Sequence, residues 1–149
     1  MNPDFCDMLS ALCAENAEFM VVGAYALAAH GLPRATGDID IWIRPSKENA
    51  QKVWSALKRF RAPLLDLTVD DLHSPDVVFQ IGAAPRRIDI LTSISGVEFD
   101  SAWARRKAVS LAGLVVPVVG RADLLINKRA AGRPQDLAVA QRLEQLPPE

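Results

Sequence analysis

Residues 37–43 of the sequence read Gly37-Asp38-Ile39-Asp40-Ile41-Trp42-Ile43, and this stretch decides how the rest of the chain is interpreted. The isoleucines occupy every second position, which is the pattern of a strand with one apolar face. Asp38 and Asp40 share the opposite face, roughly 6.5 Å apart in an extended strand. Aspartate is disfavoured in strands, and two neighbouring carboxylates repel each other unless a cation lies between them. Two interpretations follow: a site for a hard cation such as Mg2+, which takes oxygen ligands, or a solvated polar face that binds nothing.

The composition is that of one globular domain. Half of the 149 residues are hydrophobic and 23% are charged, so the chain can bury a core and is not disordered. We expect a single domain over residues 1–146, with 147–149 as a frayed tail. The net charge of -1 excludes a strongly basic protein that coats nucleic acid, but it allows a local contact patch.

The cellular location is predicted from segments that the sequence lacks and from its two cysteines. No apolar stretch approaches the length of a membrane span, and the short acidic N-terminal segment has no signal-peptide pattern. Cys6 and Cys13 lie two helical turns apart, where both are expected to be core-facing thiols rather than a disulfide. We therefore expect a cytoplasmic protein without a membrane partner.

Periodicity and turn signals predict an α+β arrangement. Helices are expected over residues 3–15, 24–29, 46–60 and 99–107, with a helical turn over 68–72 and two C-terminal helices from 121 onward, separated at Gly132-Arg133-Pro134. Strands are expected over residues 19–22, 39–43, 77–81, 87–91, 109–111 and 114–118. Residues 82–86 and the dipeptide Ala112-Gly113 have hairpin length. This order predicts one mixed or antiparallel sheet, with no repeat and no linker.

A third carboxylate lies in a later strand. Asp89 stands between two isoleucines, so it points away from the core if they point inward. Three carboxylates on one sheet surface could hold two divalent ions, which stabilise the attacking and leaving oxygens of a phosphoryl displacement. Taken alone, Asp89 is about as well suited to pair with Arg86 or Arg87. Taken together with Asp38 and Asp40, metal ligation is favoured.

Gly23 is placed where the first predicted strand turns into a helix. A glycine there lets a phosphate approach the backbone, and the amides that follow are free to donate. One glycine is a weak signal alone. It gains value because the paired aspartates follow after one short helix, which lets helix and returning strand form one unit.

Together these motifs resemble the DNA polymerase β-type nucleotidyltransferase superfamily. Its signature is a Gly-Gly or Gly-Ser turn, a helix, an Asp-x-Asp strand and a later acid, which correspond here to Gly23-Ala24, Asp38-Ile39-Asp40 and Asp89. More narrowly, residues 22–26, 30–31, 34–40 and 127–136 are similar to the abortive-infection branch, which includes toxins of type IV toxin–antitoxin systems. The resemblance spans residues 19–140.

The resemblance implies a fold and a set of residue roles. The fold would be a minimal nucleotidyltransferase fold, a short mixed sheet with helices packed mainly on one face and the site at an edge of the sheet. Asp38, Asp40 and Asp89 would hold one or two Mg2+ ions, and Asp89 would complete the site or act as base. The residues implied to bind the nucleoside triphosphate are Gly23, Ala24, Arg34, Thr36, Lys128 and Arg133.

The implied reaction moves a nucleoside monophosphate to a hydroxyl on a tRNA end or a protein, with a cognate partner protein as in toxin–antitoxin pairs. Two positions depart from the family pattern. Ala24 replaces Gly or Ser, and Val139 stands where an acid would follow Asp136 by three residues. The alternative is therefore a catalytically degenerate module of the same fold that binds nucleotide or protein. An antibiotic-modifying enzyme is a third alternative, disfavoured because no second domain encloses a drug.

Overall fold

The computed structural model describes residues 1–33 and 37–149. In chain order the elements are α1 (Pro3–Ala14), β1 (Phe19–Val22), α2 (Gly23–Ala29), β2 (Ile39–Ile43), α3 (Lys47–Phe60), the 3-10 turn η1 (Asp70–His73), β3 (Val78–Ile81), β4 (Ile88–Leu91), α4 (Phe99–Ala104), β5 (Lys107–Leu111), β6 (Leu114–Val118), α5 (Arg121–Ala131) and α6 (Pro134–Glu144). The α+β class predicted from the sequence is confirmed.

The strands form one mixed sheet of six in the order β3-β4-β2-β1-β6-β5. The pairs β1–β2, β3–β4 and β5–β6 are antiparallel, whereas β2–β4 and β1–β6 are parallel. Both predicted hairpins are present, with Ala112 and Gly113 at positive φ in the second one, as a tight two-residue turn requires. The predicted position of the site at a sheet edge is wrong, because β2 and β4 are interior strands.

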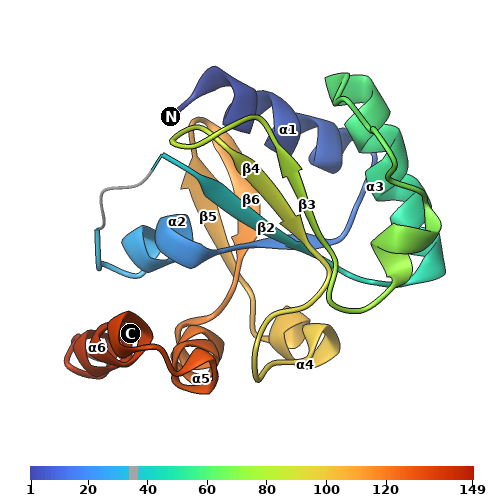
Figure 1. Cartoon of the computed structure of the whole chain (residues 1–149). Coiled ribbons are helices and arrows are strands. Elements are labelled where there is room, and N and C mark those ends of the chain that lie inside the picture. The colour runs from blue at the N-terminus through green and yellow to red at the C-terminus, as the bar shows by residue number, and fades with distance from the viewer. Residues whose placement is uncertain (34–36) are drawn as a thin grey trace.

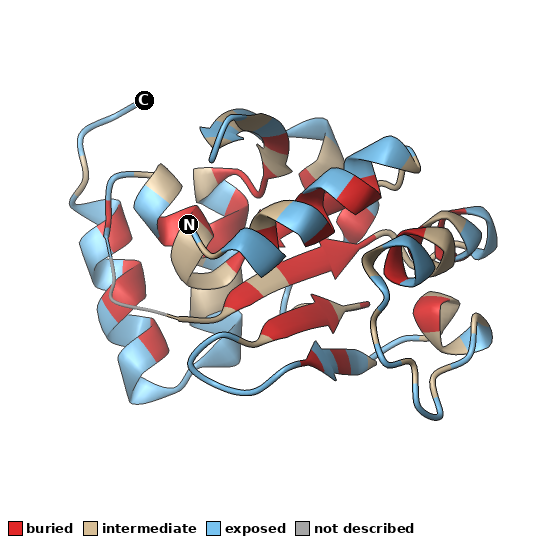
Figure 2. Cartoon of the chain, turned by 90° about the horizontal axis from the view of Figure 1, so that it is seen from above, coloured by how far each residue is buried: buried red, intermediate tan, exposed pale blue. Residues whose placement is uncertain are grey.

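The core lies between the sheet and the helices that cover it. In the view of Figure 1, α1 and α3 lie side by side in the upper part of the molecule, and α4, α5 and α6 lie along its lower side. No labelled helix stands in front of β2, β3 and β4. The inner positions of α1 are fully buried, as its periodicity predicts; they are Phe5, Met8, Leu9 and Leu12. Figure 2 shows the same division, with buried residues along the strands and exposed residues on the outer faces of the helices.

Side-chain caps explain where two of the helices begin. The Asn2 side chain accepts a hydrogen bond from the Asp4 amide at the start of α1, and Ser46 accepts one from Asn49 at the start of α3. At the other end of the chain, Gly132 adopts a left-handed conformation that ends α5, and α6 then begins with Pro134. The break between the two C-terminal helices is therefore confirmed at the predicted residues.

Two details differ from the sequence prediction. Helix α4 ends at Ala104, not near residue 107, because Lys107 pairs with Val118 and begins β5. Cys13 is exposed and Cys6 is half-buried, so the prediction of two core-facing thiols is wrong; both are free. In the two described ranges of the chain, no helix combines the length and apolar character needed to cross a bilayer.

Candidate functional site

Strand pairing brings Asp40 and Asp89 together. In the parallel pair β2–β4, Asp40 lies directly opposite Asp89, and in the pair β1–β2 it lies opposite Val22, the residue before Gly23. Neighbouring strands are about 4.8 Å apart, so the two carboxylates are adjacent on one face. Asp38 lies just before β2, two residues from Asp40 on the same side. The sequence thus predicted the grouping of the three acids correctly.

Position 23 requires a glycine, because its backbone lies against the Asp40 carboxylate. Its φ is +68°, which L side chains rarely adopt, and a Cβ placed there would lie 2.2 Å from Asp40 Oδ2. A side chain at this position would therefore collide with the carboxylate. The turn after β1 keeps bare backbone against the acidic strand, which is the close approach expected from the sequence.

Arg87 links two of the three acids, and sequence reasoning left its role undecided. Its Nε donates to Asp89 Oδ1 at 2.7 Å, and its Nη2 donates to Asp89 Oδ2 at 3.2 Å and lies 3.5 Å from Asp38 Oδ2. The Arg87 backbone amide donates to Asp38 Oδ1 at 2.9 Å. One guanidinium thus neutralises Asp89 and contributes to Asp38, and it attracts Asp40 more weakly, together with Lys128. The signal was in the sequence, since Arg87 and Asp89 are two apart in a strand and share a face.

Asp40 is the acid of this group with a clearly shifted pKa. Burial raises its pKa most, the negative charges of Asp89 and Asp38 raise it further, and Lys128 lowers it, which leaves the pKa at about 6. A carboxyl with this pKa marks a point where burial and neighbouring negative charges both oppose ionisation. Such points cluster at functional sites, although ion-pair networks also produce them.

Asp40→Asn is expected to stabilise the metal-free protein by about 1–2 kcal/mol near pH 8. The folded-state pKa of about 6 lies above the ordinary value of 3.8, so the folded state binds this proton more tightly. The stabilisation that the proton gives wild type is complete below about pH 4 and is lost as the pH rises through 6. Urea unfolding of wild type and Asp40→Asn in EDTA, at pH 4 and at pH 8, measures the difference in the free energy of unfolding. The exposed Asp66→Asn is the control. A stability difference that does not change with pH would contradict the assigned pKa.

The basic residues predicted on the C-terminal helices face the acids from the other side of a cleft. Lys128 Nζ lies 3.7 Å from Asp136 Oδ1, and Arg133 donates to the same carboxylate at 2.6 and 3.2 Å. The hydrogen bond from Arg133 is the main cause that lowers the pKa of Asp136. Asp136 is buried, and it fixes Lys128 at the cleft wall.

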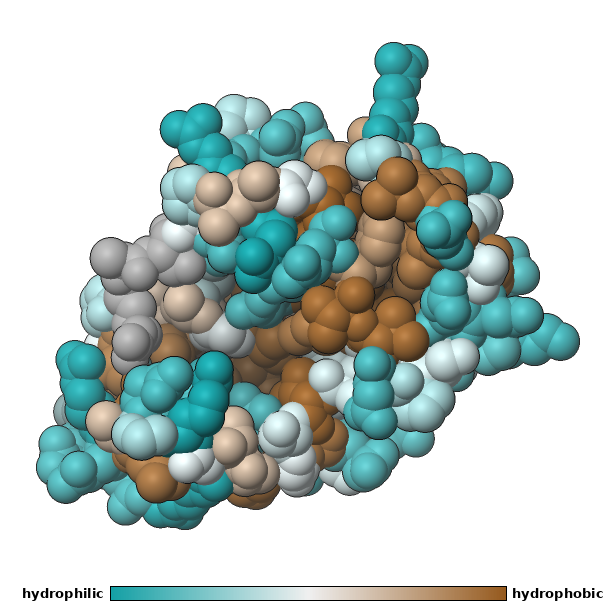
Figure 3. Space-filling view, in the orientation of Figure 1, coloured by the Kyte–Doolittle hydropathy of each residue, from teal (hydrophilic) through white to brown (hydrophobic). Residues whose placement is uncertain are grey.

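The cleft itself has a volume of about 340 Å³. Its lining combines the acidic strand, the Gly23 turn and the α5–α6 hairpin; the residues are Val22, Gly23, Asp40, Asp76, Leu91, Ser93, Ile94, Ser95, Asn127, Lys128, Ala131, Arg133 and Asp136. Figure 3 shows that the face turned to the viewer is hollowed near its middle, with apolar atoms in the hollow and hydrophilic side chains around it. The cleft therefore offers the Asp40 carboxylate on one wall and, on the other, the Lys128 ammonium and Arg133 guanidinium groups, both paired with Asp136.

A divalent cation fits the chemistry of these residues. Asp38, Asp40 and Asp89 supply hard oxygen ligands, and a bound cation would offset the burial and the neighbouring negative charges that raise the pKa of Asp40. Among the described residues, however, no three acidic, cysteine or histidine side chains are arranged around one point as metal ligands. Arg87 holds Asp89 in its present pose. A cation could recruit all three acids only if Arg87 released Asp89.

Not every predicted residue is placed at the cleft. Of the three predicted aspartates only Asp40 lines the cleft; Asp38 and Asp89 do not. Ala24 follows Gly23 in α2 but does not line the cleft either, and Arg34 and Thr36 lie outside the described residues. Trp42 is buried and packs edge-on against Phe99, with ring centroids 5.0 Å apart, so it supports the acidic strand from within the core.

Comparisons with known proteins support the fold and not a closer relationship. No protein-family model matches the sequence, and no curated protein matches it. The structure is similar to the crystal structure of "a putative nucleotidyltransferase (TM1012) from Thermotoga maritima", with a TM-score of 0.58 and 16% identity. The match covers 95% of this chain and 88% of that one. At this identity the likeness shows a shared fold, and it extends over nearly the whole of both chains.

Proposed function

We propose that this protein is a nucleotidyltransferase that moves a nucleoside monophosphate from a nucleoside triphosphate to a hydroxyl group. The observation that carries the proposal is the matched register of Asp40 and Asp89 beside the bare backbone of Gly23. Lys128 closes the same cleft from the opposite wall. The similarity in fold to the Thermotoga maritima protein supports it.

The residues divide the chemistry between them. Lys128 and Arg133 would bind the triphosphate, whose charge shifts between oxygens as the bond to the leaving pyrophosphate breaks. Gly23 and Ala24 would bring backbone amides near the phosphates, because no side chain at residue 23 stands in the way. Arg34 and Thr36, which lie outside the described residues, are proposed to take part in this binding. Asp89 would either help to hold a cation or accept the proton of the attacking hydroxyl.

Mg2+ is the proposed cofactor, and Asp38, Asp40 and Asp89 are the residues that would hold it. When bound, it supplies positive charge that stabilises the attacking and leaving oxygens. Asp40 lies opposite Asp89 in the β2–β4 register, and a bound cation would offset the burial and the neighbouring negative charges that oppose its ionisation.

The acceptor and the biological setting are proposed from the sequence resemblance. A tRNA end or a protein hydroxyl is the proposed acceptor, in a toxin–antitoxin or phage-defence role with a cognate partner protein, in the bacterial cytoplasm. The cleft is open to solvent, which leaves room for an acceptor that approaches from outside.

A degenerate binding module of the same fold is the second candidate. Val139, where the family pattern has an acid, is buried in α6 beside Ala140 and Leu143, so this position serves packing. Arg87 already occupies Asp89, which is the arrangement expected if a metal were no longer used. In that case the protein would bind nucleotide or a partner without transfer.

Calorimetric titration with each of the four ribonucleoside triphosphates, with and without Mg2+, tests the proposal. Wild type is expected to bind at least one triphosphate in a Mg2+-dependent way, and the Asp38→Asn/Asp40→Asn variant to bind it at least about a hundredfold more weakly. Asp66→Asn is the control for loss of one exposed carboxylate. Equal binding by the double variant would contradict the assigned site, and absence of binding to all four would favour a module whose partner is a protein.

A further inference from the structure

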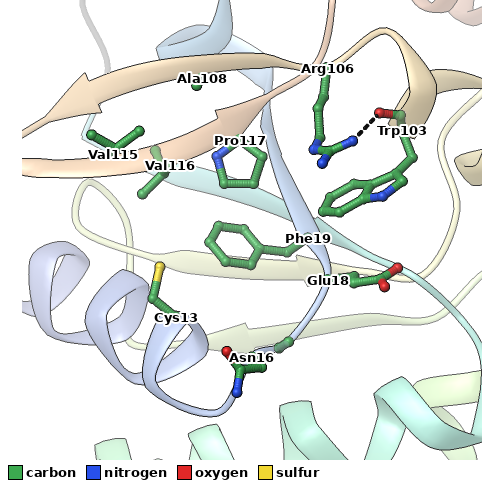
Figure 4. A pocket seen from close by; sticks show the side chains of 11 residues that line it. Cys13, Asn16, Glu18, Phe19, Trp103, Arg106, Ala108, Val115, Val116 and Pro117 are labelled. Carbon is green, nitrogen blue, oxygen red and sulfur yellow. Dashed lines mark hydrogen bonds between the residues drawn. The ribbon is translucent and has the colours of Figure 1, made fainter.

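A second cavity lies at the other end of β1 from Gly23. It has a volume of about 660 Å³, within the range of small-molecule sites, and is shown in Figure 4. Its walls come from the end of α1, the start of β1, α4 and the β5–β6 hairpin; they are Cys13, Asn16, Ala17, Glu18, Phe19, Trp103, Arg106, Ala108, Val115, Val116 and Pro117. None of these residues lines the carboxylate cleft. The cavity is therefore separate from the proposed nucleotide site.

The floor of this cavity is apolar and rigid. Phe19 and Val116 belong to adjacent strands and are fully buried, and Pro117 extends the same surface. Val115, at the rim, is 70% exposed, which is unusual for a valine in a strand that also contributes to the core. Phe19 and Val116 present almost no surface to solvent, so a planar apolar group in this cavity would cover the accessible apolar surface of Pro117 and Val115.

Arg106 supplies the positive charge at this cavity, and two contacts with Trp103 hold its guanidinium group. Its guanidinium lies 3.8 Å from the centre of the Trp103 ring, and its Nη1 donates to the Trp103 carbonyl oxygen at 2.8 Å. Phe99 stacks on the Trp103 ring, with the ring centroids 5.5 Å apart. The indole therefore serves as a platform that keeps the guanidinium at the cavity wall, as Figure 4 shows.

The charge of Arg106 has no carboxylate partner among the described residues, unlike that of its neighbour. Arg105 forms two hydrogen bonds with buried Asp123, at 2.7 and 3.0 Å. Glu18, the acid at this cavity, is paired with Arg44 instead. The remaining N–H groups of Arg106 are thus free to donate to an anion, and a carboxylate matches the guanidinium fork.

We propose that this cavity binds a small planar aromatic carboxylate. The ring would lie against the accessible apolar surface of Val115 and Pro117, and the carboxylate would accept hydrogen bonds from Arg106. The proposal is independent of the nucleotide site and stands or falls without it.

The test uses 2-naphthoate as the anionic probe and naphthalen-2-ylmethanol as its uncharged counterpart. In 1H–15N spectra of wild type, 2-naphthoate is expected to shift the indole N–H signal of Trp103 saturably, and a Trp103→Phe variant identifies that signal. The alcohol is expected to bind about tenfold more weakly, because it cannot form a charge-assisted pair with Arg106. Arg106→Gln should lose the same factor of about ten for 2-naphthoate and little for the alcohol.

Two further variants keep the result specific. Arg142→Gln removes an exposed arginine from α6 and should leave binding unchanged, whereas Val115→Glu adds a negative charge at the exposed rim and should weaken 2-naphthoate binding. Well-dispersed spectra establish that each variant is folded. Absence of a saturable shift in wild type, or equal affinity for 2-naphthoate in wild type and Arg106→Gln, would overturn the proposal.

Discussion

Gly23→Ala is expected to lower the free energy of unfolding by about 2–4 kcal/mol, as measured by urea denaturation. A positive φ costs an L residue roughly 1–2 kcal/mol. The remainder comes from the collision with Asp40, since the new Cβ would lie 2.2 Å from Oδ2 and 3.1 Å from Cγ. The Asp40 carboxylate would have to move, so the same variant should also weaken any Mg2+-dependent nucleotide binding.

Gly113→Ala separates the cost of a positive φ from the cost of the collision with Asp40. Gly113 also has a positive φ, +84°, but a Cβ there would meet no atom within 4 Å. It should therefore cost only the backbone part, about 1 kcal/mol. In an Asp40→Ala background, the cost of Gly23→Ala should fall toward that of Gly113→Ala, because the carboxylate is gone. If the two glycine variants were equally destabilised in wild type, the close contact between Gly23 and Asp40 would be refuted.

The regions that sequence predicted well are those where local chemistry leaves few alternatives. The isoleucine alternation defined β2, and Gly23 marked a turn that only a glycine accommodates beside Asp40. Asp89 was grouped with the other acids from its strand pattern alone, and the parallel pairing with Asp40 fulfils that grouping. In each case the residue pattern of the motif itself carried the signal, although Gly23 and Asp89 contact Asp40 from distant positions in the chain.

The features that sequence missed depend on long-range contacts. Two strands with the same pattern can occupy the middle or the edge of a sheet, so the interior position of β2 was not encoded locally. Helix α4 ends early because Lys107 pairs with Val118, a contact that outweighs helix propensity. The pairing of Arg87 with Asp89 follows from their two-residue spacing, but the further contact of Arg87 with Asp38 needed the long-range arrangement of the sheet.

Arg87→Gln and Asp89→Asn are expected to change the affinity for Mn2+, used as a probe for Mg2+, in opposite directions. Arg87→Gln removes the guanidinium that competes for Asp89 and Asp38, so affinity should rise by about tenfold. Asp89→Asn removes an oxygen ligand and leaves Arg87 near Asp38, so affinity should fall by about a hundredfold. Electron paramagnetic resonance of free Mn2+ measures both and needs no knowledge of the acceptor.

The sign of the Arg87 effect separates the two candidate functions. In an enzyme, the guanidinium is a resident counter-charge that a metal displaces, so its removal strengthens metal binding. In a degenerate module, Arg87 stabilises acids that no longer bind metal, so its removal leaves Mn2+ affinity negligible and lowers the stability of the fold instead, since Asp89 is buried and would lose its partner. Arg86→Gln, which removes an exposed neighbouring arginine, is the matched control and should change neither quantity. A weaker Mn2+ affinity in Arg87→Gln than in wild type would contradict the idea that Arg87 competes with the metal, because electrostatics alone gives the opposite sign.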